Sequence, residues 1–429
     1  MRSHVMKHWL AAVVLFASFS CSERSTTPPP STAPSTPAAA PAAPAAPATE
    51  LLVWHSYRAA EKAAFEKVVA NYNQATKGVK VNTLAVPYDA FADKITAAVP
   101  RGNGPDVFIF AQDRMGGWVE AGNTIEPIDF FLDAATKARY LPTTLEAMVY
   151  RGTTYGLPLN YKSITMIYNK KLVPTPPKTS SELVATAKKL TDKKAGKFGL
   201  AYSYGDFYYH AALMNAFGGK VFAPGPEPTL NDPANVKSVE YLMKWVEKDG
   251  ILPLEPSTAL ITALFNEGKA AIVFNGPWFL GEIAPTVEYG LAPLPVIDEA
   301  KSPMKPWMTV EGAYISAPSK NKEAAYAFIK YLTDVEAATV LALEGRQSPA
   351  NKAVYEDAKV AADPVLKALR DQVEVAVPMP NVPEMTMVWT PATTAMNAIL
   401  KKSSTPRAAL DEAQKAVAKD VATLRKKTP

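Results

Sequence analysis

A regular alternation of strand-like and helix-like segments over residues 51–110 is the feature that most constrains the fold. Short apolar segments, which are typical of buried strands, are separated by segments in which apolar residues recur at helical spacing. Strands are expected at 51–54, 79–86 and 106–110, and helices at 59–74 and 88–99. Because crossovers between parallel strands are right-handed and place helices against the sheet, this order predicts a parallel, doubly wound α/β sheet.

The rest of the chain repeats this mixed pattern, with a strand at 270–274 and helices at 323–333 and 410–424. With 429 residues, of which 48% are hydrophobic, the chain can bury a large core and is long enough for two domains. The sequence therefore predicts a bilobed α/β protein. The net charge of +5 does not indicate nucleic-acid binding, because Lys and Arg are scattered along the expected helix faces rather than clustered.

The amino terminus has the pattern of an export signal. A basic start precedes the apolar run 9–19, which is too short to span a membrane. We expect a signal peptide at 1–20, followed by either lipid attachment to Cys21, the only cysteine in the sequence, or plain secretion. Residues 21–49 are rich in Pro and Ala and predict an extended tether. The lipidated form would be membrane-anchored in the periplasm or on the outer face of the cytoplasmic membrane.

Polar and aromatic residues follow three of the expected strands. They are found at 55–58, at Asp113 and Arg114, and at 275–278. In doubly wound sheets, ligands bind beyond the carboxyl ends of the strands. On these residues alone a second interpretation stays open, because an Asp-Arg pair at a strand end is often a surface ion pair and a lone Trp is often part of the core.

Four stretches, at 102–122, 155–179, 270–278 and 377–389, resemble the maltose/maltodextrin-binding family of extracellular solute-binding proteins, which serve ABC importers. The resemblance extends from about Leu51 to the carboxyl end. It implies a type II periplasmic-binding-protein fold, in which two α/β lobes joined by hinges close over a ligand in the cleft between them. It also implies a membrane permease as partner and a monomeric state.

The resemblance also implies where the lobes begin and end. The amino-terminal lobe is expected at 51–160 plus 312–358, and the carboxyl-terminal lobe at 163–307 plus 365–429. The hinges are expected at Asn160–Lys162, at Thr309–Gly312 and just before Asp363.

By the same resemblance, both lobes supply ligand-binding residues. A pyranose needs flat aromatic surfaces for its C–H faces and polar side chains for its hydroxyls. Carboxylates accept from hydroxyls and arginine donates to them, which suits Asp113 and Arg114. Asp206 has an alternative role as a helix cap. The implied ligand-binding set is Ser56, Arg58, Phe110, Asp113, Arg114, Lys162, Asp206, Tyr208, Tyr209, Trp278, Met379 and Trp389.

Three members of this set depart from the family pattern. Phe110 stands where the family often has Trp, which leaves an apolar contact of smaller ring area. Arg58 and Lys162 are basic where the family has acids. Both can donate to hydroxyls, so we expect a neutral maltodextrin-like oligosaccharide or disaccharide, with trehalose and a cyclic glucan as variants.

Two rival functions use the same cleft. A glycoside hydrolase would need two carboxylates that flank the scissile bond, and Asp113 and Asp206 are available. No residue is marked as a proton donor or nucleophile, so no catalytic residues are expected. A sugar receptor for signalling is the other rival. His55 and His210, the only histidines after the export signal, lack metal-ligand spacing, and neither a metal nor a cofactor is expected.

Overall fold

The computed structural model describes residues 49–427. The expected signal peptide, Cys21 and nearly all of the expected tether lie outside the described residues. The first strand begins at Thr49, the last residue of the expected tether and two residues before the expected start of the lobe.

Seven strands form the larger sheet, in the order β16-β6-β15-β3-β1-β2 with β17 beside β15. They are β1 (Thr49–His55), β2 (Val79–Ala85), β3 (Val107–Ala111), β6 (Gly156–Lys162), β15 (Trp307–Ile315), β16 (Ser348–Pro349) and β17 (Val377–Pro378). β1 pairs in parallel with both β2 and β3, as the sequence predicted. The sheet as a whole is mixed, because β15 is antiparallel to β3 and β6. β15 returns from a distant part of the chain, so the crossover rule does not set its direction.

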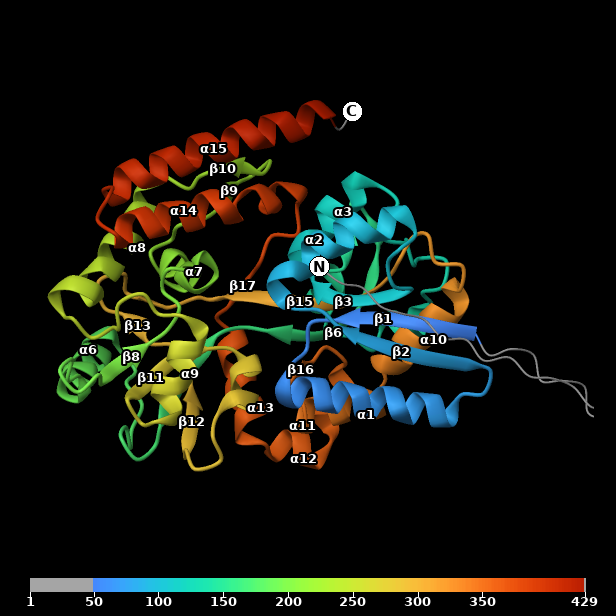
Figure 1. Ribbon diagram of the computed structural model, residues 1–429, viewed down its shortest axis with the longest axis horizontal. Coiled ribbons are helices and arrows are strands. Elements are labelled where there is room, and N and C mark those ends of the chain that lie inside the picture. Colours follow the sequence, from blue (N-terminus) through green and yellow to red (C-terminus); the bar gives the residue numbers. More distant parts are fainter. Residues whose placement is uncertain (1–48, 428–429) are drawn as a thin grey trace, which may run out of the picture. The chain divides into compact units, whose positions relative to one another are not determined.

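Helices cover both faces of the larger sheet, because alternate residues of each strand point to opposite sides. One apolar cluster packs Val53 and Ile109 against α1, α10 and α11, and another packs Phe108 and Phe110 against α2 and α3. These helices are α1 (Ala59–Ala75), α2 (Tyr88–Ala98), α3 (Met115–Ala121), α10 (Lys322–Leu332) and α11 (Val335–Leu343). Figure 1 shows α1 and α11 on one side of β1 and β2, with α2 and α3 on the other. The doubly wound arrangement is therefore confirmed.

The smaller sheet has four strands in the order β12-β7-β11-β8. They are β7 (Thr165–Asn169), β8 (Phe198–Ala201), β11 (Ala270–Asn275) and β12 (Tyr289–Ala292). Their helices are α6 (Ser180–Leu190), α7 (Phe207–Ala216), α8 (Pro233–Met243), α9 (Thr258–Asn266), α14 (Trp389–Leu400) and α15 (Pro406–Lys427). α9 packs on one face, and the others belong to the apolar cluster on the opposite face.

The chain crosses between the two sheets near the segments expected as hinges. It leaves β6 at Lys162 and enters β7 at Thr165. It returns through β15, which pairs with β17 at Trp307 and with β3 from Glu311 onward. Asp363 then caps α13 (Pro364–Val373), which packs against β12. None of the helices between residues 49 and 427 combines the length and the apolar character that a membrane span requires.

Short elements fill the remaining connections. They are the helices α4 (Ala134–Lys137), α5 (Pro142–Glu146) and α12 (Ala358–Ala362), and the strand pairs β4 (Val149–Tyr150) with β5 (Thr153–Thr154), β9 (Phe222–Ala223) with β10 (Glu227–Pro228), and β13 (Val296–Ile297) with β14 (Ser302–Pro303).

A buried histidine in α7 makes the fold sensitive to acid. His210 is buried, with Nε2 2.9 Å from Ser238 Oγ, and burial lowers the pKa of His210 to about 4. Between pH 6.5 and 4 the unfolded chain binds a proton at this position that the folded chain does not, so stability falls as the pH falls through this window. From pH 7 to pH 4, we expect the free energy of unfolding to decrease by about 3 kcal/mol less in His210→Gln than in the wild type.

Urea unfolding of both proteins at the two pH values measures this difference. The pKa of His55 is also lowered to about 4, mainly by burial, but His55 is present in both proteins and cancels from the comparison. Equal losses of stability in the two proteins would show that His210 does not cause the acid sensitivity.

Candidate ligand-binding cleft

Asp113 and Arg114 lie where β3 ends, in the single turn η2 (Gln112–Arg114) that leads into α3. Arg114 Nε is 3.2 Å from Asp113 Oδ2, and Asp113 is only 3% exposed. Burial raises the pKa of Asp113 to about 6, although the Arg114 guanidinium opposes this shift. The pair is therefore not the exposed surface ion pair that the sequence left open.

The glycines after this pair have a packing role. A Cβ atom on Gly116 would lie 2.5 Å from the carbonyl oxygen of Asn381 and 2.8 Å from the backbone nitrogen of Pro383. Gly116 thus allows α3 to lie against η6 (Pro383–Met387), the turn that comes just before Trp389. This close approach places Asp113 and Arg114 near residues that pack with the smaller sheet.

An array of aromatic rings lies opposite the Asp-Arg pair. Tyr208 at the start of α7 has its ring centroid 6.2 Å from that of Trp278 in η4 (Pro277–Glu282) and 5.7 Å from that of Tyr209. Trp389 begins α14, and the Arg114 guanidinium is 5.7 Å from the centroid of its ring. Counting the Asp-Arg pair, the structure therefore brings together six of the expected residues, from elements that pack on both sheets.

Trp307 lies beneath this array. Its ring centroid is 5.8 Å from that of Trp389 and 6.2 Å from that of Tyr208, and the residue is buried. A structural role for Trp307 fits this position, because a buried ring can support its neighbours without reaching a ligand.

Two buried donors in the array, Nε of Arg114 and the indole nitrogen of Trp389, make no hydrogen bond of good geometry. Both nevertheless have the Asp113 carboxylate beside them, since Oδ2 of Asp113 is 3.2 Å from Arg114 Nε and the Trp389 indole opposes the rise that burial causes in the pKa of Asp113. The hydroxyl groups of the tyrosines are occupied, because Tyr208 Oη lies 3.1 Å from Thr309 Oγ1 and Tyr209 donates to Asn275 Oδ1 at 3.1 Å. Both donors therefore have Asp113 as a partner of poor geometry, and a ligand oxygen or water would complete their hydrogen bonding.

Asp206 has the capping role that the sequence left open. Its Oδ1 accepts from the backbone N–H of Tyr208 at 2.9 Å and so caps α7. Asp206 is solvent-exposed, yet burial raises its pKa; Tyr208 is half-buried, and burial raises its pKa to about 12. Asp206 and Tyr208 are thus reached by solvent and yet surrounded by protein atoms. This combination is typical of a crevice and agrees with an open cleft at the start of α7.

Arg58 bridges the two sets of elements. It precedes α1, and its Nε is 2.9 Å from Oε1 of Glu282 at the end of η4. The backbones also approach closely, because a Cβ atom on Gly281 would lie 3.1 Å from the nitrogen of Ala60. Arg58 thus already has a carboxylate partner. Ser56, half-buried, lies two residues before it.

Lys162 belongs to a buried ionic cluster. Its Nζ donates to Glu61 Oε1 at 2.6 Å and lies 3.1 Å from Glu311 Oε1, and Lys162 is 7% exposed. Burial disfavours the ammonium, but Glu311 and Glu61 hold the pKa of Lys162 above its ordinary value. Tyr57 and Asn160 both donate to Glu311 Oε2 at 2.9 Å. The expected donation from Lys162 to a sugar hydroxyl therefore competes with two carboxylates.

Two apolar members of the expected set are buried. Phe110 is 2% exposed, because its ring is stacked between Phe91 at 4.7 Å and Tyr88 at 5.0 Å. Tyr88 thus covers the Phe110 ring that was expected to contact the ligand. Met379 is buried too, and its carbonyl oxygen accepts from the Gln112 side chain at 3.2 Å. Sequence reasoning missed Tyr88, whose signal was an aromatic residue where the helix after the second strand begins.

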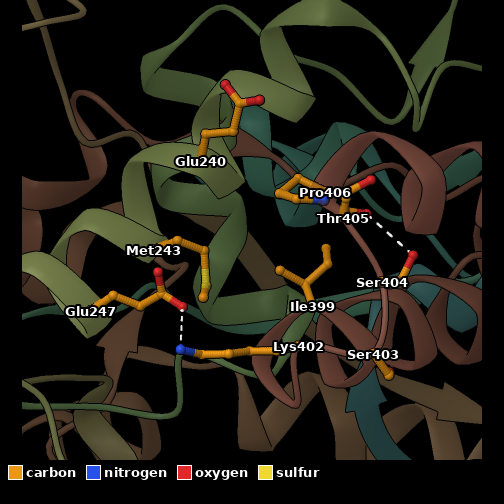
Figure 2. Close-up of a pocket in the computed structure, with 9 residues that line it drawn as sticks. All are labelled: Glu240, Met243, Glu247, Ile399, Lys402, Ser403, Ser404, Thr405 and Pro406. Atoms are coloured by element: carbon orange, nitrogen blue, oxygen red, sulfur yellow. Dashed lines mark hydrogen bonds and ion pairs between the residues drawn. The ribbon is translucent and has the colours of Figure 1, made fainter.

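A separate surface pocket of about 540 Å³ lies between α8 and the turn from α14 to α15. Figure 2 shows Glu247 and Lys402 paired on its wall. Its lining residues are Glu240, Met243, Glu247, Ile399, Lys402, Ser403, Ser404, Thr405 and Pro406. It contains none of the expected ligand-binding residues, so we do not place the site there. Residues 49–427 hold no group of three or more side chains suited to a metal ion.

The fold and the cleft define a two-lobed solute-binding protein of the type II periplasmic class. The pattern of the bacterial extracellular solute-binding protein family matches residues 56–339, and the chain belongs to this family. It is 32% identical over 360 residues to the maltotriose-binding protein of Pyrococcus abyssi, covering 82% of this chain and 78% of that one.

Two further proteins agree with this assignment. A maltooligosaccharide ABC transporter solute-binding lipoprotein of Streptococcus pneumoniae is 28% identical over 348 residues, covering 77% of this chain and 79% of that one. The structure of the Thermus thermophilus maltotriose-binding protein bound with maltotriose superposes with a TM-score of 0.80 at 27% identity. It covers 86% of this chain and all of that one.

Proposed function

We propose that this protein is the substrate-binding lipoprotein of an ABC importer, and that it captures maltodextrin-like sugars and delivers them to a membrane permease. The observation that carries the proposal is the meeting of the buried Asp113 and its half-buried partner Arg114 with the rings of Tyr208, Trp278 and Trp389. Aromatic faces suit the C–H faces of a pyranose, and the charged pair suits its hydroxyls. The names of the relatives support the same class of ligand.

The proposed mechanism is closure of two lobes on the sugar. We assign the amino-terminal lobe to 51–160 plus 312–358 and the carboxyl-terminal lobe to 163–307 plus 365–429. The two sheets and their separate apolar clusters support this division. A ligand that contacts both lobes binds the closed state more tightly and shifts the population toward it. The permease would then recognise the closed, loaded monomer.

Membrane attachment through Cys21 is part of the proposal. The export pattern of the sequence supports it, as does the lipoprotein among the relatives. Mass spectrometry of the membrane fraction from an expressing bacterium would detect diacylglycerol on Cys21, whereas an unmodified, freely released protein would contradict attachment.

Calorimetric titration of the domain that starts at Thr49 tests the choice of ligand. The panel is maltose, maltotriose, trehalose, a cyclodextrin and galactose. We expect saturable binding of at least one glucan, with the sugar recovered intact afterwards. Absence of binding by every glucan would contradict the proposal.

The same titration separates transport from hydrolysis, the rival function that uses Asp113 and Asp206. A hydrolase would return shortened sugars, which chromatography of the recovered panel detects. The family relatives are solute-binding proteins, which favours intact recovery.

A further inference from the structure

Tyr88 is an exposed aromatic residue in an unusual place. It is the first residue of α2 and is 58% exposed, although large aromatic side chains are mostly covered in folded proteins. Its ring is stacked on Phe110, with centroids 5.0 Å apart and an angle of 29° between the planes. Phe110 is in turn stacked on Phe91 with an angle of 3°. Tyr88 is thus the outermost of three stacked rings, held flat by two buried ones.

Tyr88 lies beside the cleft, because Phe110, on which it is stacked, stands in β3 three residues before Asp113. Protein atoms surround its phenol closely enough that burial raises the pKa of Tyr88, and the charge of Asp113 and the hydroxyl of Tyr208 raise it further. The neighbouring Asp89 likewise raises the pKa of Asp206, after burial. The start of α2 therefore faces both the acid of the larger sheet and the aromatic start of α7.

Among the described residues, Phe110 is the one ring in stacking contact with Tyr88, and no cation–π contact covers the other face of the Tyr88 ring. Among the expected ligand-binding residues on the larger sheet or after its strands, those that solvent reaches are the polar Ser56, Arg58 and Arg114, because Phe110 is buried. A sugar held by Trp278 and Trp389 alone would have its aromatic contacts on one side of the cleft.

We propose that Tyr88 is the aromatic platform of the amino-terminal lobe, against which the C–H face of a glucopyranose unit packs while its hydroxyls meet Asp113. This proposal rests on the proposed sugar-binding function and adds a residue that determines affinity and selectivity. The stack on Phe110 and Phe91 fixes the orientation of the ring before the sugar arrives, which lowers the entropy cost of binding.

Three substitutions test the platform against a role in shielding Phe110. Tyr88→Phe keeps a flat ring and should bind the preferred glucan within about threefold of the wild type. Tyr88→Leu still covers Phe110 but offers no flat face, and Tyr88→Ala removes both. We expect both of these variants to bind about 10- to 100-fold more weakly. Phe130→Ala is the matched control, because Phe130 is 93% exposed in a loop outside the cleft residues.

The readouts are calorimetric affinity and the urea midpoint of the domain from Thr49. Unchanged midpoints with weaker binding by the Leu and Ala variants support the platform, as does normal binding by Phe130→Ala. If Tyr88→Leu binds as well as Tyr88→Phe, or if Tyr88→Ala binds like the wild type, the platform is overturned while the proposed function stands. If the wild type binds no glucan at all, both proposals fail together.

Discussion

Replacing Lys162 with methionine is expected to lower the free energy of unfolding at pH 7 by about 3–5 kcal/mol. The substitution keeps much of the side-chain volume but leaves Glu61 and Glu311 as two buried carboxylates without a cation. Burial already raises the pKa of Glu61 against the opposing effect of Lys162, so losing the ammonium removes its main compensation. Urea denaturation followed by circular dichroism measures the change.

Lys67→Met is the matched control. Lys67 Nζ lies 2.6 Å from Glu344 Oε1, as close as Lys162 Nζ lies to Glu61 Oε1. The side chains of Lys67 and Glu344 are each about half exposed, however. An exposed pair contributes about 0–1 kcal/mol, so this variant should stay near the wild type. In Lys162→Met, protonation of Glu61 or Glu311 removes one of the two uncompensated buried charges. The difference in free energy of unfolding between this variant and the wild type should therefore decrease from pH 7 to pH 5. A gap that does not change with pH would mean that lost packing, not charge, explains the effect.

Removing the carboxylate of Asp113 is expected to weaken sugar binding by about 3–5 kcal/mol, or more than 100-fold. In Asp113→Ala the hydroxyl acceptor is lost, and Arg114 is left in the cleft without its partner. Folding should change little, because burial already makes ionised Asp113 costly and Arg114 keeps its contact with the Trp389 ring. Calorimetry gives the affinity, and urea unfolding gives the stability of the same preparation.

Asp371→Ala is the control for this substitution, since Asp371 pairs with Lys367 at 2.8 Å on the exposed surface of α13. The pH dependence supplies a second check. The pKa of Asp113 is about 6, so wild-type affinity should fall as the pH decreases below 6 and the carboxylate is protonated. Asp113→Asn should remove this dependence. If Asp113→Ala is mostly unfolded but its folded fraction binds the sugar with wild-type affinity, Asp113 has a structural role and not a binding role.

Local periodicity predicted most of the secondary structure because apolar spacing reports on burial directly. Strand β1, helix α1 and strand β11 lie close to their expected bounds. The direction of β15 was not predictable in this way, because it depends on a pairing between residues about 200 positions apart. Local pattern carries no information on how a distant segment re-enters a sheet.

The same limit applies to the site. The strand ends indicated Asp113 and Trp278, because each follows a strand, whereas Trp389 was indicated only by the family resemblance. The sequence did not indicate that Arg58 would pair with Glu282, more than 200 residues away. Nor did it indicate that Phe110 would be covered by Tyr88. Tertiary packing determines both the Arg58–Glu282 pair and the covering of Phe110. In each case a neighbour distant in sequence decides whether the side chain is free to contact a ligand.

The contact between Gly281 and Ala60 bears on how the strength of capture could be adjusted. A side chain at position 281 would meet the backbone of Ala60 and the methyl of Ala59 within 3.3 Å, and so would act as a wedge between the start of α1 and η4. In the proposed mechanism, measured affinity includes the cost of bringing the lobes together, so such a wedge would weaken the proposed capture without touching the ligand. On that mechanism, a substitution at position 281 changes the ligand concentration at which the protein fills and leaves its ligand preference unchanged.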